Sequence, residues 1–128
     1  MKPCFLDTCA VIDILADRQA PIDALEEYDD VLISHVVLGE LIFGCHRSRH
    51  PERELARLAE WLPTVSIITA TPETAHIYGS LAADLEKQGA RIPHNDLWIA
   101  AICVQTNLPL ISSDNHFSRL RSLHWIGY

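Results

Sequence analysis

The sequence has no long apolar run: its longest uninterrupted stretch, Leu97 to Val104, is far shorter than the roughly 20 residues that a transmembrane helix needs. Its first residues reach the acidic Asp7 too early to supply the apolar core of a secretion signal. Both absences argue against membrane proteins and exported proteins. We therefore expect a soluble, cytoplasmic protein that makes no contact with a membrane.

Paired cysteine motifs, low-complexity segments and internal repeats are also missing. The four cysteines lie far apart, and no C-x-x-C occurs. In a cytoplasmic protein, cysteines of this kind are usually reduced core residues. An alternative is a zinc site formed by Cys45, His46 and His50, although adjacent ligands lack the spacing that zinc sites usually show.

Basic side chains are scarce, with 10 Lys and Arg against 17 Asp and Glu and a formal net charge of −7. A broad surface for nucleic acid is not expected, because phosphate binding depends on Lys and Arg. One local exception is a basic cluster, whose simplest interpretation is a solvated helix face with a loop. The basic cluster consists of His46, Arg47, Arg49, His50, Arg53 and Arg57.

The length and composition of the chain suit a single folded domain. The chain has 128 residues, of which 48% are hydrophobic and 21% are charged. A chain of this size buries enough surface for a conventional core without disulfides. We therefore expect one domain over residues 1–128.

Short apolar runs alternate with segments of helical periodicity along the whole chain. Proline opens several of the expected helices, at Pro21, Pro51 and Pro72, and glycine lies near the ends of two others, at Gly44 and Gly89. Strands separated by helices pair in parallel, which predicts a three-layer α/β/α sandwich with a central, mostly parallel sheet. The expected strands are 4–6, 31–33, 65–68, 108–111 and an edge strand at 123–126.

Four carboxylates occupy positions that core packing alone does not explain. Asp7 and Asp114 end the first and fourth strands, Glu40 interrupts an apolar helix, and Asp96 precedes the most apolar helix. Each has an ordinary explanation, as a helix cap, a turn residue or a solvated position. Taken together, they lie where strand ends and helix starts converge on one edge of a parallel sheet.

Converging carboxylates need a positive partner, and no lysine is adjacent to any of the four in sequence. Oxygen ligands without Cys or His among them suit Mg²⁺ or Mn²⁺. Such ions activate a water and stabilise displacement at a phosphodiester. The pattern therefore predicts nuclease chemistry.

The order and spacing of these motifs resemble the PIN domain, specifically its VapC branch. The match extends over nearly the whole chain. Four segments carry the resemblance: Phe5-Leu6-Asp7-Thr8, Gly39-Glu40-Leu41-Ile42-Phe43-Gly44, Ile92-Pro93-His94-Asn95-Asp96-Leu97-Trp98-Ile99-Ala100-Ala101 and Leu108-Pro109-Leu110-Ile111-Ser112-Ser113-Asp114-Asn115-His116-Phe117.

The resemblance implies a PIN-like fold, Mg²⁺-dependent endoribonuclease activity, and a homodimer that a cognate antitoxin inhibits. It implies that Asp7, Glu40, Asp96 and Asp114 are the catalytic, metal-binding acids. Two further residues match polar positions that usually support these acids, namely Thr8 and Ser112.

One position departs from the family pattern. After Asp-Thr the family often has Asn, whereas this chain has Cys9. An amide that could orient a carboxylate or a water is missing there. The substitution bears on the fine structure of the site, since all four acids remain.

Under this resemblance the basic cluster becomes a guide for RNA phosphates, with Arg47, Arg49 and Arg53 as RNA-binding candidates, or else part of the antitoxin contact. Two other functions remain as alternatives. One is a PIN-like binding module without catalysis, which the presence of all four acids disfavours. The other is a metal-dependent phosphatase of the haloacid dehalogenase type, which requires an Asp-x-Asp-x-Thr motif that the segment after Asp7 lacks.

Overall fold

The computed structural model describes residues 1–128 and is built around a five-stranded sheet in which every strand pair is parallel. The strands lie in the order β3-β2-β1-β4-β5. Their bounds are β1 (Pro3–Leu6), β2 (Asp30–Ser34), β3 (Ser66–Ile68), β4 (Leu110–Ile111) and β5 (Trp125–Ile126). The predicted α/β class and its parallel sheet are confirmed.

Six α-helices and two short 3₁₀ helices connect the strands. None of the helices combines the length and hydropathy that crossing a bilayer requires. The helices are α1 (Thr8–Leu15), α2 (Gln19–Leu25), α3 (His35–Arg47), α4 (Pro51–Trp61), η1 (Leu62–Thr64), α5 (Pro72–Lys87), α6 (His94–Thr106) and η2 (Asn115–Arg119).

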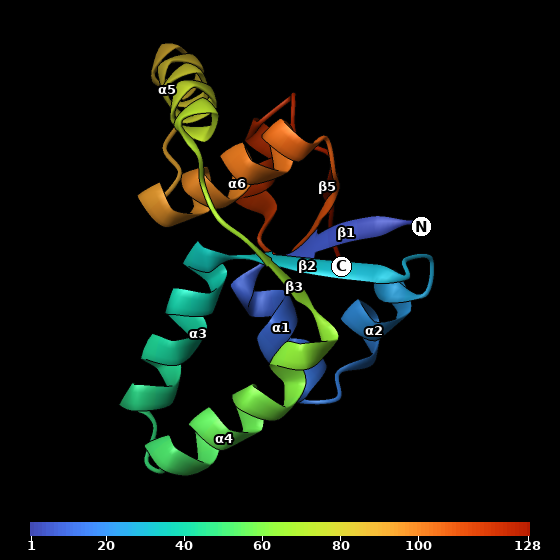
Figure 1. The fold of residues 1–128 in the computed structure, drawn as a ribbon. Helices are drawn as coiled ribbons and strands as arrows, with labels where there is room; N and C mark the ends of the chain where they lie inside the picture. Colours follow the sequence, from blue (N-terminus) through green and yellow to red (C-terminus); the bar gives the residue numbers. More distant parts are fainter.

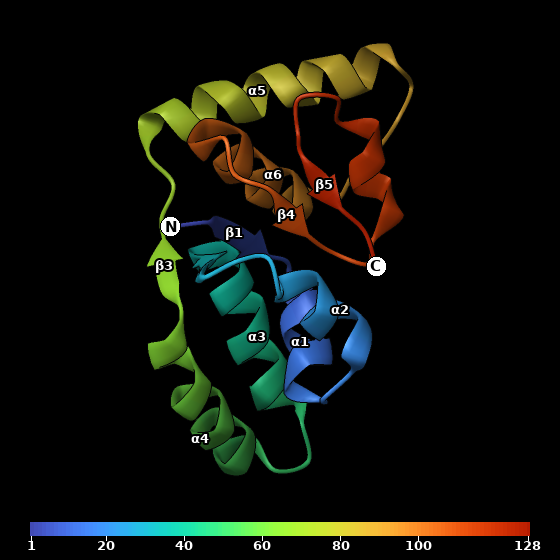
Figure 2. The ribbon, with the colours of Figure 1, turned by 90° about the vertical axis from the view of Figure 1, so that its right-hand side faces the viewer.

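The layers are visible in two perpendicular views (Figures 1 and 2). Helices α1 to α4 lie on one side of the sheet, and α5 and α6 lie on the other. Helices α3 and α4 form a hairpin that extends away from the sheet. This arrangement is the α/β/α sandwich that the alternation of strands and helices predicted.

Helix boundaries follow local chemistry, with small differences from the sequence prediction. Ser34 caps α3 by accepting a hydrogen bond from the Val37 amide at 3.2 Å. Helix α3 continues past Gly44 to Arg47, whereas α5 ends as expected before Gly89, which has a φ of +66°. Helix α2 begins at Gln19, and Pro21 lies in its first turn, as the sequence predicted.

The strand order reverses between β1 and β4, which are neighbours in the sheet but far apart in the chain. The chain runs from β1 outward through β2 and β3, then returns to β4 on the other side of β1. In parallel sheets a crevice opens at such a reversal, beyond the carboxyl ends of the strands. The residues that follow β1 and β4 therefore lie at the natural position for a functional site.

Candidate metal centre

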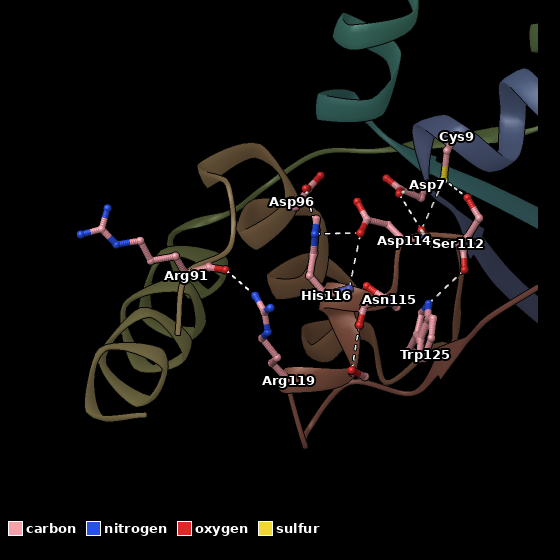
Figure 3. Close-up of polar contacts among 12 residues, drawn as sticks. Asp7, Cys9, Arg91, Asp96, Ser112, Asp114, Asn115, His116, Arg119 and Trp125 are labelled. Atoms are coloured by element: carbon pink, nitrogen blue, oxygen red, sulfur yellow. Dashed lines mark hydrogen bonds and ion pairs between the residues drawn. The ribbon is translucent and has the colours of Figure 1, made fainter. Parts of the chain in front are cut away.

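Asp7 and Ser112 follow neighbouring strands and meet at the reversal point. Leu6 pairs with Ile111 in the sheet, so the next residue on each strand is carried to the same edge. The Asp7 side chain is buried, with 5% of the residue exposed, and its Oδ2 accepts a hydrogen bond from Ser112 Oγ at 2.8 Å. Ser112 Oγ also accepts from the Asp114 amide at 3.0 Å. A single hydroxyl thus ties the Asp7 carboxylate to the backbone of Asp114 (Figure 3).

Cys9 adds a thiol to this network. Its Sγ donates to Asp7 Oδ2 at 3.4 Å, lies 3.4 Å from Ser112 Oγ, and accepts from Ser113 Oγ at 3.3 Å. A thiol is a weak donor. Cys9 therefore contacts the Asp7 carboxylate through a weaker donor than an amide N–H.

Thr8 is the second polar residue that was predicted to support the acids, and it contacts Glu40. Thr8 Oγ1 donates to Glu40 Oε1 at 2.8 Å. Glu40 lies in the second turn of α3 and not at the helix start, as its position within His35–Arg47 shows. Its carboxylate reaches the sheet edge from the side of the helix.

Asp96 and Asp114 are joined through a residue that the sequence analysis gave no role. The His116 ring lies between them, with Nε2 2.9 Å from Asp96 Oδ2 and Nδ1 2.8 Å from Asp114 Oδ1 (Figure 3). Asp96 comes from the first turn of α6, and His116 comes from η2. The three residues bring ligand atoms within 4.8 Å of one another.

The electrostatics of Asp96 show that the acids influence one another. Burial raises the pKa of Asp96, the charge of Asp7 raises it further, and the charge and hydrogen bond of His116 lower it, with a smaller rise from Glu40. The result is a pKa of about 6. Carboxylates held together in this way are neutralised by a cation, so the donor set fits a divalent metal ion.

His116 lies among the acids, although the predicted ligand set contained carboxylates alone. His116 is two residues beyond Asp114, and the 3₁₀ turn of η2 folds its ring back over that carboxylate. The amide of His116 also contacts Asp114 Oδ1 at 3.4 Å. An Asp shortly after a strand, followed two residues later by His, was the available sequence signal. The position of the ring depends on the geometry of the η2 turn.

The basic cluster lies apart from the acids, at the tip of the α3–α4 hairpin. Arg47 ends α3, Arg49 lies in the loop, and Arg53 belongs to the first turn of α4. All three side chains are exposed, and none forms an ion pair with a carboxylate. The Arg47 guanidinium lies 5.2 Å from the centre of the Phe43 ring. These charges are free to meet an external anion.

The zinc alternative finds no support in the geometry. Cys45, His46 and His50 do not gather into a group of metal ligands, whereas Asp96, Asp114 and His116 do. The four cysteines are free thiols, as expected, but only Cys4 and Cys103 are buried in the core, whereas Cys9 and Cys45 are partly exposed.

Comparisons with known proteins all point to the same family. The model of the PIN domain matches residues 4–123. The ribonuclease VapC2 of Haemophilus influenzae is 32% identical, and the alignment covers 98% of this chain and all of that protein. The ribonuclease VapC5 of Mycobacterium tuberculosis is 31% identical over 90% of this chain and 85% of that protein.

Solved structures agree at the level of the fold. The VapBC2 structure of Rickettsia felis, bound to a DNA fragment from its promoter, includes a chain with a TM-score of 0.89 and 26% identity over 98% of both chains. A chain of VapBC-5, a member of the VapBC family of toxin–antitoxin systems from Mycobacterium tuberculosis, has a TM-score of 0.80 and 27% identity over the full length of both.

Proposed function

The chain belongs to the PIN-domain family, on its VapC branch, and on that premise we propose that it is a metal-dependent endoribonuclease, the toxin of a toxin–antitoxin pair. The observation that carries the proposal is the gathering of acids at the reversal point of the sheet. Asp7 is tied to Asp114 through Ser112, and Asp114 is joined to Asp96 through His116.

Asp7, Glu40, Asp96 and Asp114 are the residues that we propose hold Mg²⁺, for which Mn²⁺ could substitute. A bound divalent ion supplies a Lewis acid that lowers the pKa of a water and stabilises charge at a phosphodiester. The donor set supports this assignment, because Mg²⁺ prefers carboxylate oxygens and these acids otherwise repel one another.

The supporting residues orient the acids before any substrate arrives. Ser112 donates to Oδ2 of Asp7 and Thr8 donates to Oε1 of Glu40, which leaves the second oxygen of each carboxylate without a side-chain donor. Orientation of this kind keeps ligand oxygens in place at no cost when the ion binds. We therefore propose that Thr8 and Ser112 act by positioning these two acids.

The partners that we propose are RNA, a cognate antitoxin and a second copy of the chain in a homodimer. RNA follows from relatives named as ribonucleases, and the antitoxin follows from similar structures that are toxin–antitoxin complexes. Residues 1–128 would act as one domain in the cytoplasm. Single-stranded or looped RNA is the expected substrate, since unpaired bases are the most accessible to proteins.

One assay separates this function from the two alternatives. The purified protein is incubated with Mg²⁺ and either single-stranded RNA or a phosphomonoester. We expect internal cleavage of the RNA and no release of phosphate from the monoester. Phosphate release alone would indicate a phosphatase, and RNA binding without cleavage would indicate a binding module; either outcome would contradict the proposal.

We also predict that the basic cluster guides RNA phosphates. Replacing Arg47, Arg49 and Arg53 with Ala should weaken RNA binding and lower the slope of log K against log salt by about 2, at roughly 0.7 per phosphate contact. Filter-binding titrations at several salt concentrations measure both effects. Mg²⁺ binding should be unchanged, because these side chains lie away from the acids.

A charge-matched control keeps this test specific. Replacing the exposed Lys87, Arg91 and Arg121 with Ala removes the same charge from the part of the chain around α5 and η2. This control should change RNA affinity much less. Equal losses in both variants would show a general effect of net charge, and unchanged affinity in the first variant would leave the cluster as a solvated surface or an antitoxin contact.

A further inference from the structure

The imidazole of His116 lies inside the group of acids. Both of its nitrogens lie within 3 Å of a carboxylate oxygen, and 18% of its side chain is exposed. The buried Phe117 anchors the same 3₁₀ turn, and its ring lies 5.0 Å from that of His116, centre to centre. The ring is therefore held at the site and does not belong to a mobile surface side chain.

Hydrogen-bond counting shows what the two contacts require. A neutral imidazole has one N–H donor and one lone pair, whereas an ionised carboxylate only accepts. Between Asp96 and Asp114, one nitrogen can donate, and the other then faces a carboxylate oxygen with its lone pair. A second proton on the ring, a proton on the carboxyl group, or a metal ion bound by both the nitrogen and the carboxylate would satisfy that second contact.

The type of ligand decides which ion the site prefers. Mg²⁺ favours oxygen ligands and binds imidazole poorly, whereas Mn²⁺ and the later divalent metals accept carboxylate and imidazole together. A site of four carboxylates and a site of carboxylates with one imidazole therefore differ in metal preference. Asp96, Asp114 and His116 have the second composition.

We propose that His116 supplies a nitrogen ligand on the Asp96–Asp114 side of the metal centre and thereby shifts its preference from Mg²⁺ toward Mn²⁺. The inference rests on the proposed metal centre and deepens it. The other role open to His116 is that of a hydrogen-bond clamp, which holds the two carboxylates together without contacting the ion.

The test measures metal binding directly, without RNA. Mn²⁺ is added to the full chain, and pulsed electron paramagnetic resonance detects coupling of the bound Mn²⁺ to a ligand nitrogen. We expect ¹⁴N coupling in the parent, a change to ¹⁵N coupling when the protein is labelled with ¹⁵N-histidine, and loss of the coupling in His116→Ala. His76→Ala, which alters an exposed histidine on α5, is the matched control and should keep the coupling.

Competition titrations with Mn²⁺ and Mg²⁺ give the second measurement. The ratio of Mn²⁺ to Mg²⁺ affinity should fall about tenfold or more in His116→Ala, in line with the usual effect of altering a metal site. It should fall in His116→Asp as well, because an oxygen ligand replaces the nitrogen. The labelled parent protein provides the nitrogen test even if a variant does not fold.

The outcomes separate the inference from the function on which it rests. Bound Mn²⁺ without nitrogen coupling, or an unchanged affinity ratio in His116→Ala, would overturn the ligand role while leaving the metal-dependent nuclease intact. A rise in affinity for both ions in His116→Ala would identify the clamp instead. A parent protein that binds neither ion would contradict the proposed function itself.

Discussion

Asp96→Asn is expected to abolish RNA cleavage while leaving the cation-free protein at least as stable as the parent. The asparagine keeps the size of the side chain and one oxygen, but it removes the charge that we propose holds the metal ion. Removing one electrostatic contact to a reacting group commonly lowers the rate by roughly two to three orders of magnitude. The expected loss here is of that order or larger.

The expected stability of cation-free Asp96→Asn follows from the raised pKa of Asp96 in the parent. Burial, followed by the charge of Asp7, brings the pKa to about 6 from an ordinary value of 3.8. Between these two pH values the folded state holds a proton that the unfolded state has released. The free energy of unfolding therefore falls as pH rises through this window, and at pH 7 the ionised group costs roughly 1 to 3 kcal/mol.

Asparagine removes that cost, so the variant should lack this loss of stability between pH 4 and pH 6. Thermal melts in a chelating buffer at pH 4.5 and pH 7 measure the difference. Asp84→Asn, which alters an exposed acid on α5, is the matched control and should behave like the parent. If Asp96 were only a favourable charge at the start of α6, the variant would keep its RNA cleavage, and this result would defeat the assignment.

Mg²⁺ is expected to raise the melting temperature of the parent strongly and that of Asp96→Asn much less. An ion that binds only the folded state stabilises it by about 2.7 kcal/mol when its concentration is 100 times the dissociation constant. For a domain of this size the corresponding shift is roughly 10 °C. The acids provide the reason, because the bound cation also relieves their mutual repulsion.

Melting curves over a series of Mg²⁺ concentrations measure this shift, and Ca²⁺-free buffer with matched ionic strength excludes general salt effects. Asp84→Asn should follow the parent at every concentration. Equal shifts in the parent and in Asp96→Asn would place the stabilising ion elsewhere on the molecule.

The fold was predictable because its signals are local and repeated. Apolar runs at 4–6 and 31–33 lie within β1 and β2, and the run at 108–111 contains the shorter β4. The alternation of these runs with helices required parallel pairing. The shared edge of a parallel sheet then indicated where Asp7 and Asp114 would lie. Helix ends were less exact, since Gly44 lies near the end of α3 but the helix continues to Arg47.

The contacts of the candidate site were less accessible to sequence reasoning. The roles of Thr8 and Ser112 were expected only by resemblance, and the structure shows which acid each one contacts. His116 was missed because its position depends on the backbone of η2, for which no hydrophobic period gives a signal. The contact of Cys9 with Asp7 likewise depends on side-chain direction at the start of α1.

The most direct test of the metal-dependent nuclease is RNA cleavage by the purified protein before and after its divalent ions are removed. Single-stranded RNA is incubated with the protein in EDTA, and Mg²⁺ or Mn²⁺ is then added in excess over the chelator. The account predicts no cleavage in EDTA, cleavage on addition of either ion, and none at any stage with Asp96→Asn. Full cleavage in EDTA by protein freed of metal would contradict it, because the proposed ligands have no catalytic role without an ion.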